Sequence, residues 1–221
     1  MAARDRIPAY LVTPASGAGR GIVVIHDAWG LGDFVRDGCD RLAREGFVAL
    51  APDLLRGCEP RDLAAAEKLA AELDADAVVA GLESAIAELY NQPETVGPSI
   101  GALGFGLGGS LALLLAARQR RIGAVVDIGG PGLERELESE LARVRAPVMA
   151  VLAGDSATPG AASAAERLRA GLASAGVRAS VELRAGVGDG YMDDTRLDAY
   201  DAAAAAETWG ALLAFFRSEL A

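Results

Sequence analysis

Short, fully apolar strands that alternate with helical segments constrain this chain most. Residues 21–26 read GIVVIH and residues 122–128 read IGAVVDI, with almost no polar alternation. A strand of this kind is buried on both faces, which is typical of a parallel sheet covered by helices on both sides. Similar runs predict further strands, the first of them at a sheet edge, at residues 7–12, 47–50, 99–103, 148–152 and 177–183. The sequence therefore predicts an α/β protein with a mostly parallel central sheet.

Helical periodicity fills the segments between these strands. Helices are expected at residues 33–44, 109–117, 133–143, 161–173 and 197–220, and two more within 61–89 with a break at 74–76. Asp33 is expected to cap the first helix, and Asp193 and Asp194 the last, while Pro52 should end the third strand. Because the 221 residues show no repeat and no linker, we expect a single domain over residues 1–221.

Charge and composition narrow the classes of partner. The net charge of -10 and the pI near 4.7 argue against binding to nucleic acid or to an anionic membrane, so a small-molecule ligand or substrate is the expected partner. No apolar run is long enough to cross a bilayer, and the N-terminus has no signal-like apolar region. A cytoplasmic protein, monomeric or homodimeric, is expected, and the excess of arginine over lysine points to a GC-rich bacterial genome.

Few residues are available for metal or redox chemistry. His26 is the sole histidine, which excludes the common zinc sites that need two. Cys39 and Cys58 offer neither a metal pattern nor a disulfide framework. We expect no metal and no cofactor.

Polar segments follow several of the predicted strands. They read HDAWGL at 26–31, APDLLRG at 51–57, GFGLGG at 104–109, AGDSATP at 153–159 and GVGDGYMDD at 186–194. In a parallel sheet these ends meet at one edge, where ligands bind. Together the segments resemble the dienelactone hydrolase family over almost the whole chain. The resemblance implies a compact α/β-hydrolase fold without a separate lid domain, and an activity on carboxylic esters or lactones.

The resemblance also assigns a catalytic triad, residue by residue. It places the nucleophile at Gly106, the acid at Asp155 and the general base at Asp189. Glycine has no side chain that can attack a carbonyl, and an aspartate is a much weaker base than imidazole at neutral pH. Ordinary triad hydrolysis is therefore expected to be absent.

Other parts of the family's site are retained in the sequence. The resemblance assigns oxyanion-type backbone donors to Ala28 and Leu107. Asp27 stands where the family holds a carboxylate close to the nucleophile, so Asp27, Asp155 and Asp189 are expected around one cavity. Carboxylates so close cannot all ionise cheaply, and one with a raised pKa would serve as a general acid or base.

Three more residues are expected at this pocket. His26 ends a strand, and its ring is expected to bond loop backbone, with a pocket donor as the alternative. Trp29 is expected as pocket wall or core packing, and Tyr191 as a pocket residue. Ser110, one helical turn beyond position 106, is expected to face the interior rather than act as a displaced nucleophile.

The sequence leaves several functions open. The first hypothesis is a protein repurposed for non-hydrolytic acid–base chemistry on, or binding of, a small carbonyl or lactone-type metabolite. The alternatives are a non-catalytic binding or scaffold protein, and a residual ester or lactone hydrolase with a non-standard nucleophile. A fourth is nucleotide binding, because Gly104, Gly106 and Gly109 fit the dinucleotide fingerprint, with Asp127 near the end of the following strand.

Overall fold

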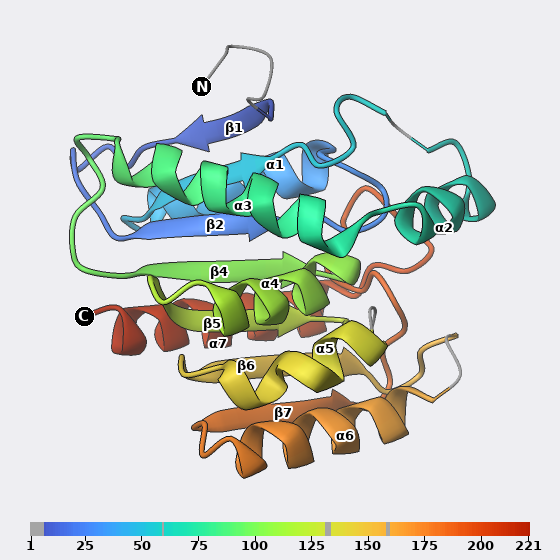
Figure 1. Cartoon of the computed structure of the whole chain (residues 1–221). Helices are drawn as coiled ribbons and strands as arrows, with labels where there is room; N and C mark the ends of the chain where they lie inside the picture. Colours follow the sequence, from blue (N-terminus) through green and yellow to red (C-terminus); the bar gives the residue numbers. More distant parts are fainter. Residues whose placement is uncertain (1–6, 59, 131–133, 158–159) are drawn as a thin grey trace.

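Seven strands form one sheet in this computed structural model, which describes residues 7–58, 60–130, 134–157 and 160–221 (Figure 1). The strand order across the sheet is β1-β3-β2-β4-β5-β6-β7. The strands are β1 (Ala9–Val12), β2 (Gly21–Ile25), β3 (Val48–Pro52), β4 (Ile100–Phe105), β5 (Ile122–Ile128), β6 (Val148–Ala153) and β7 (Ala179–Arg184). Only β1 is antiparallel to its neighbour, and all the other pairs in the sheet are parallel. The predicted α/β fold with a mostly parallel sheet is confirmed.

Helices cover both faces of the sheet. They are α1 (Asp33–Arg44), α2 (Leu63–Ala71), α3 (Ala75–Tyr90), α4 (Leu107–Arg118), α5 (Glu134–Glu140), which continues into a 3-10 turn (Leu141–Arg143), α6 (Ala161–Ser174) and α7 (Ala202–Glu219). One buried cluster holds Leu82, Leu114 and Leu168 from α3, α4 and α6, and the cluster on the other face holds Cys39 and Trp209 from α1 and α7. Figure 1 shows α3 to α6 on the near side of the sheet and α7 on the far side. Burial on both sides explains why the central strands are continuously apolar.

None of the helices in the described part of the chain is both long and apolar enough to cross a membrane.

In the first two thirds of the chain, the observed helix boundaries agree closely with the predicted ones. The periodic segment at 61–89 is divided into α2 and α3, as predicted, and Asp74 caps α3 through the N–H groups of Asp76 and Ala77. The helix predicted at 109–117 begins earlier, at Leu107, because α4 starts one residue after the end of β4.

Of two predicted end signals, one is wrong and one is confirmed. The cap of α1 is Gly32, and Asp33 is the first helical residue, where its negative charge interacts favourably with the positive end of the helix dipole. β3 ends at Pro52, as predicted, and Pro52 lies opposite Ala9 of the edge strand β1. The pairing of β3 with β2 ends at Leu50, so no ladder bond to β2 requires an N–H from Pro52.

The predicted start of the last helix is wrong. α7 begins at Ala202 and is capped by Asp201, whose carboxylate accepts the N–H of Ala204 at 2.9 Å. Asp193 instead accepts the backbone N–H of Thr195 at 3.0 Å, and Asp194 does not cap a helix either. Several aspartates in this segment are suitable caps, and local sequence alone does not choose among them.

The glycines of GFGLGG allow the turn between β4 and α4 to pack directly on the sheet. A Cβ atom at position 104 would lie 2.0 Å from the carbonyl oxygen of Gly108, and one at position 108 would lie 2.2 Å from that of Ile25. A Cβ atom at position 109 would lie 1.8 Å from Oδ1 of Asp127. Close backbone packing therefore accounts for Gly104 and Gly108, and the Asp127 carboxyl accounts for Gly109.

A methyl group in this turn should be costly. We expect Gly108→Ala to lower the free energy of unfolding by about 1–3 kcal/mol, because the added carbon meets backbone that has no room to move. The matched control is Gly210→Ala in α7, where no atom would lie within 4 Å of the new Cβ. The control should be neutral or stabilising by up to about 1 kcal/mol, since alanine is the better helix former. Thermal unfolding followed by circular dichroism checks both, and equal melting temperatures for the two variants would contradict the packing argument.

Candidate active site

A single residue in an unusual conformation joins β4 to α4. Gly106 has φ 50° and ψ -124°, a region that L-residues rarely adopt. Its N–H donates to the carbonyl of Ile128 at 2.7 Å, and its own carbonyl accepts the N–H of Gly109 at 2.9 Å. These bonds hold the turn against β5 at the carboxyl edge of the sheet. The geometry is that of a sharp strand-to-helix elbow.

Asp27 faces this elbow from the neighbouring strand. It follows β2, which pairs with β4, and a Cβ atom at position 106 would lie 3.0 Å from the Cβ of Asp27. Its Oδ1 accepts the backbone N–H of Trp29 at 2.9 Å, which fixes the side chain in the loop. The Cα and Cβ atoms of Asp27 therefore flank the place where a side chain on the elbow would begin.

Burial changes the acidity of Asp27. It raises the pKa of this carboxyl from 3.8 to about 6, and the negative charge of Asp193 acts in the same direction. The N–H of Trp29 and the charge of Arg196 oppose the rise. Asp27 therefore exchanges a proton within one pH unit or so of neutrality, the range in which a general acid–base group is most effective.

Asp193 and Arg196 are site neighbours that the sequence analysis missed. Asp193 is buried, and its Oδ1 accepts both the N–H and the hydroxyl of Thr195. The guanidinium of Arg196 lies 5.3 Å from the centroid of the Trp29 ring. No sequence signal separates these residues from the other charged residues of the loop, because only the fold brings the loop against residues 26–31.

The structure does not bring Asp155 and Asp189 together with Asp27 at one site. Asp155 and Asp189 are both exposed, and the charged groups that shift the pKa of Asp27 are Asp193 and Arg196. The loops of Asp155 and Asp189 do meet, since the N–H of Asp155 donates to the carbonyl of Val187 at 3.0 Å. In the same place the hydroxyl of Ser156 donates to Oδ2 of Asp189 at 2.7 Å. Across the described ranges, no three His, Cys, Asp or Glu side chains are arranged to hold a metal ion.

His26 joins two loops at the carboxyl edge of the sheet. The ring is buried, which lowers its pKa, and Nε2 accepts the N–H of Leu54 at 3.0 Å. Because Nε2 is the acceptor, the proton of the neutral ring is on Nδ1, which lies 2.6 Å from the carbonyl oxygen of Asp27. Both ring nitrogens thus bond backbone, and the imidazole holds the Asp27 loop in place.

The two predicted aromatic pocket residues differ in their environment. Trp29 is half-buried beside Asp27, with Arg196 over its ring. Tyr191 is 2% exposed and belongs to the core on the α7 side, where its hydroxyl is 2.9 Å from that of Thr208. The pocket position predicted for Tyr191 is therefore corrected to a core position, because α7 supplies the partner for its hydroxyl.

Backbone N–H groups surround the elbow as well. Leu107 is the first residue of α4, so its N–H has no partner within the helix. Ala28 lies directly after Asp27 in the loop that follows β2, the strand next to β4. The positive end of the α4 dipole adds to these donors, and such an arrangement suits a carbonyl oxygen or an anion.

Comparison with known protein families gives a match over almost the whole chain. The profile of the dienelactone hydrolase family matches residues 7–220. The chain belongs to the dienelactone hydrolase family. Membership confirms the resemblance that the strand-end segments carry, and the seven-stranded sheet is the compact form of the α/β-hydrolase fold that it implies.

Several relatives in the dienelactone hydrolase family match over nearly their full length. Protein usf of Aquifex pyrophilus is 28% identical over 223 residues, which cover 97% of this chain and 94% of the relative. A putative carboxymethylenebutenolidase of Aquifex aeolicus has the same identity and the same coverage. Among solved structures, a putative dienelactone hydrolase from Klebsiella pneumoniae superposes with a TM-score of 0.83 at 26% identity, covering 96% of this chain and 92% of that one.

The pKa of Asp27 has a measurable consequence for stability. Its folded value of about 6 exceeds the ordinary 3.8, so the folded state binds this proton more tightly than the unfolded state does. The stabilisation is complete below the unfolded pKa and is lost as the pH rises through the folded pKa. Asp27→Asn cannot ionise, so relative to wild type it should gain roughly 1–3 kcal/mol between about pH 4 and about pH 8.

Thermal unfolding of both proteins across this pH range gives the measurement. Asp155→Asn, at an exposed position, is the matched control, and its difference from wild type should change little with pH. A pH-independent difference for Asp27→Asn would show that Asp27 is not a proton carrier near neutrality.

Proposed function

We propose that this member of the dienelactone hydrolase family binds a small carbonyl or lactone-type compound at the elbow and moves a proton on it through Asp27, without an acyl-enzyme intermediate. One observation carries the proposal. Gly106 keeps the elbow conformation with its positive φ while offering no side chain, and the Cβ of Asp27 lies 3.0 Å from the point where that side chain would begin. Position 106 thus offers no nucleophile, and the residue beside it is a proton carrier.

Loss of the triad is part of the proposal. Gly106 and Asp189 stand where the family resemblance assigns the nucleophile and the imidazole base, and His26 is committed to two backbone groups. In enzymes where the comparison has been made, loss of the nucleophile or its base lowers turnover by about a million-fold. We therefore infer that ordinary ester hydrolysis is not the main activity of this site.

The remaining groups are suited to proton transfer next to a carbonyl. The carbonyl oxygen of the ligand would accept the N–H groups of Ala28 and Leu107. The carboxylate of Asp27 would remove a proton from the adjacent carbon. The C–H electron pair would form a C=C bond, and the π pair of the carbonyl would move to the oxygen, giving an enolate. Asp27 then returns a proton to the same or a conjugated carbon. Protons and charge therefore balance within the site, and these reaction steps use no metal and no co-reactant.

Hydrogen–deuterium exchange at carbon tests this reaction without knowledge of the natural substrate. A panel of small ketones, enol lactones and β-keto esters in D₂O is followed by NMR with and without the protein. We expect faster deuterium incorporation next to the carbonyl for at least one compound. The enhancement should fall by about 100-fold or more in Asp27→Asn, because that is the usual contribution of a positioned acid–base group.

The asparagine variant keeps an oxygen that can accept the Trp29 N–H, so the loop should retain its conformation. Asp155→Asn serves as the exposed control and should exchange at the wild-type rate. Unchanged exchange in Asp27→Asn would overturn the proposed role of Asp27. Saturable binding of a panel compound without any exchange would favour a binding or scaffold protein over an enzyme.

The hydrogen bond between Ser156 and Asp189 favours one other function, a residual esterase with Ser156 as nucleophile. A hydroxyl 2.7 Å from a carboxylate has a possible base, although a carboxylate activates a serine much less than imidazole does.

A serine-directed fluorophosphonate probe distinguishes the two functions. We expect no labelling above that of Ser156→Ala, as read by intact-protein mass spectrometry. Stoichiometric modification of Ser156 in wild type, lost in Asp189→Asn, would support the esterase and contradict the loss of triad chemistry.

A further inference from the structure

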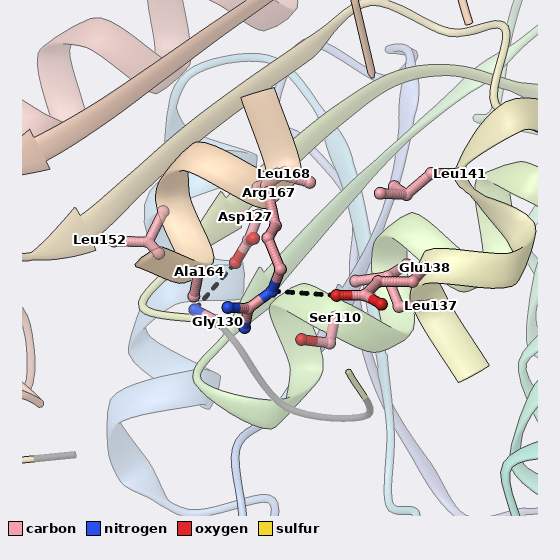
Figure 2. A pocket seen from close by; sticks show the side chains of 10 residues that line it. All are labelled: Ser110, Asp127, Gly130, Leu137, Glu138, Leu141, Leu152, Ala164, Arg167 and Leu168. Carbon is pink, nitrogen blue, oxygen red and sulfur yellow. Dashed lines mark hydrogen bonds and ion pairs between the residues drawn. The ribbon is translucent and has the colours of Figure 1, made fainter. Parts of the chain in front are cut away.

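A cavity lies on the face of the sheet that α4, α5 and α6 cover, away from the elbow. Its volume is about 30 Å³, room for roughly two water-sized groups. Figure 2 shows the side chains that line it. Its walls are aliphatic and come from α5, the following turn, β6 and α6: Leu137, Leu141, Leu152, Ala164 and Leu168.

Two buried polar side chains are among the residues that line this mainly aliphatic cavity. Asp127 of β5 and Ser110 of α4 are each 1% exposed, and both line the cavity. Oδ1 of Asp127 accepts the N–H of Gly130 at 3.0 Å (Figure 2). Burial raises the pKa of this carboxyl to about 7, and the Gly130 N–H opposes the rise. Near neutral pH the cavity therefore gains and loses a full negative charge.

Glycines on both sides make room for this carboxyl. A Cβ atom at position 109 would lie 1.8 Å from Oδ1 of Asp127, and one at position 130 would lie 2.7 Å from it. Two neighbouring backbone segments thus omit a side chain where the carboxyl lies. The position is closely fitted to an acidic group, although an isolated buried carboxylate is costly.

The cation that lines the cavity is engaged elsewhere. Nε of Arg167 lies 2.9 Å from Oε1 of Glu138, and its Nη1 donates to the hydroxyl of Ser163 (Figure 2 shows the first pair). Among the described residues, the pKa of Asp127 responds to burial and to Gly130, and no described cation lowers it. The ionised carboxylate therefore lacks a counter-charge from this part of the chain.

We propose that this cavity binds the ammonium group of a small primary amine, with Asp127 and Ser110 as its polar partners and the aliphatic walls around its carbon. An ammonium supplies three N–H donors and the positive charge that the buried carboxylate lacks. The volume admits an amine of methylammonium size, and the apolar walls disfavour a fully hydrated ion. This site is separate from the elbow and does not depend on the function proposed there.

Ligand-induced stabilisation tests the site. Methylammonium chloride is titrated against wild type at about pH 8, with sodium chloride at equal ionic strength as the reference. We expect the melting temperature to rise by about 2–4 °C near saturation, because a ligand that binds only the folded state stabilises it. The rise should be smaller at about pH 6, where Asp127 is mostly protonated and offers no charge.

Variants locate the effect. Asp127→Asn should abolish the shift and Ser110→Ala should weaken the affinity several-fold, while Asp27→Asn, at the elbow, should leave it unchanged. If Asp127→Asn does not fold, the pH dependence in wild type and the Ser110→Ala affinity decide the question. A shift that survives in Asp127→Asn, or one that is lost in Asp27→Asn, would overturn the assignment.

Ligand chemistry gives an independent check. Methanol, of similar size but neutral, and tert-butylammonium, too large for the cavity, should both fail to stabilise the protein. An equal shift with potassium chloride would show a site for any monovalent cation, and an equal shift with methanol would show one for a neutral molecule. Either result would overturn the amine proposal.

Discussion

Contact between backbone and backbone at the elbow determines how this site is built. The turn from β4 into α4 rests on the end of β2, with no side chain between Gly108 and the carbonyl of Ile25. This close approach orients the start of α4 at the carboxyl edge of the sheet and gives Gly106 its left-handed conformation. It also brings Asp27, at the end of the neighbouring strand, against the elbow. Without that approach, neither the N–H donors nor the carboxyl would share one site.

Carboxyl groups partly or fully removed from solvent are the second organising feature. Asp27 follows β2 and Asp127 lies on β5, the two strands that flank β4, and burial raises the pKa of both. Asp27 faces the elbow, whereas Asp127 lines the cavity under α4. Backbone N–H groups close by donate to each carboxyl, from Trp29 to Asp27 and from Gly130 to Asp127. These bonds keep each side chain in place and still leave its charged form costly, which is the condition for proton exchange or for binding a cation.

Sequence reasoning was most accurate where a residue's role depends on its immediate neighbours. The apolar strands, the break between α2 and α3, and the turn at Gly106 all follow from patterns a few residues long. It failed where several similar residues compete in one loop. Asp201 rather than Asp193 caps α7, and Tyr191 lies in the core because α7 places Thr208 beside it. Such choices depend on which helix packs on the loop, and no local pattern records that.

By itself, the sequence determined the parallel sheet, the family and the glycine at the elbow, because periodicity and short glycine patterns are local properties of a chain. The tertiary structure decided which acidic residues matter. Asp27, Asp155 and Asp189 are the same residue type in the sequence, yet only Asp27 is half-buried, while the other two remain exposed. The acidity of a carboxyl depends on solvent and on charges that arrive from distant segments, as Asp193 and Arg196 do here. Only the folded chain brings those segments together.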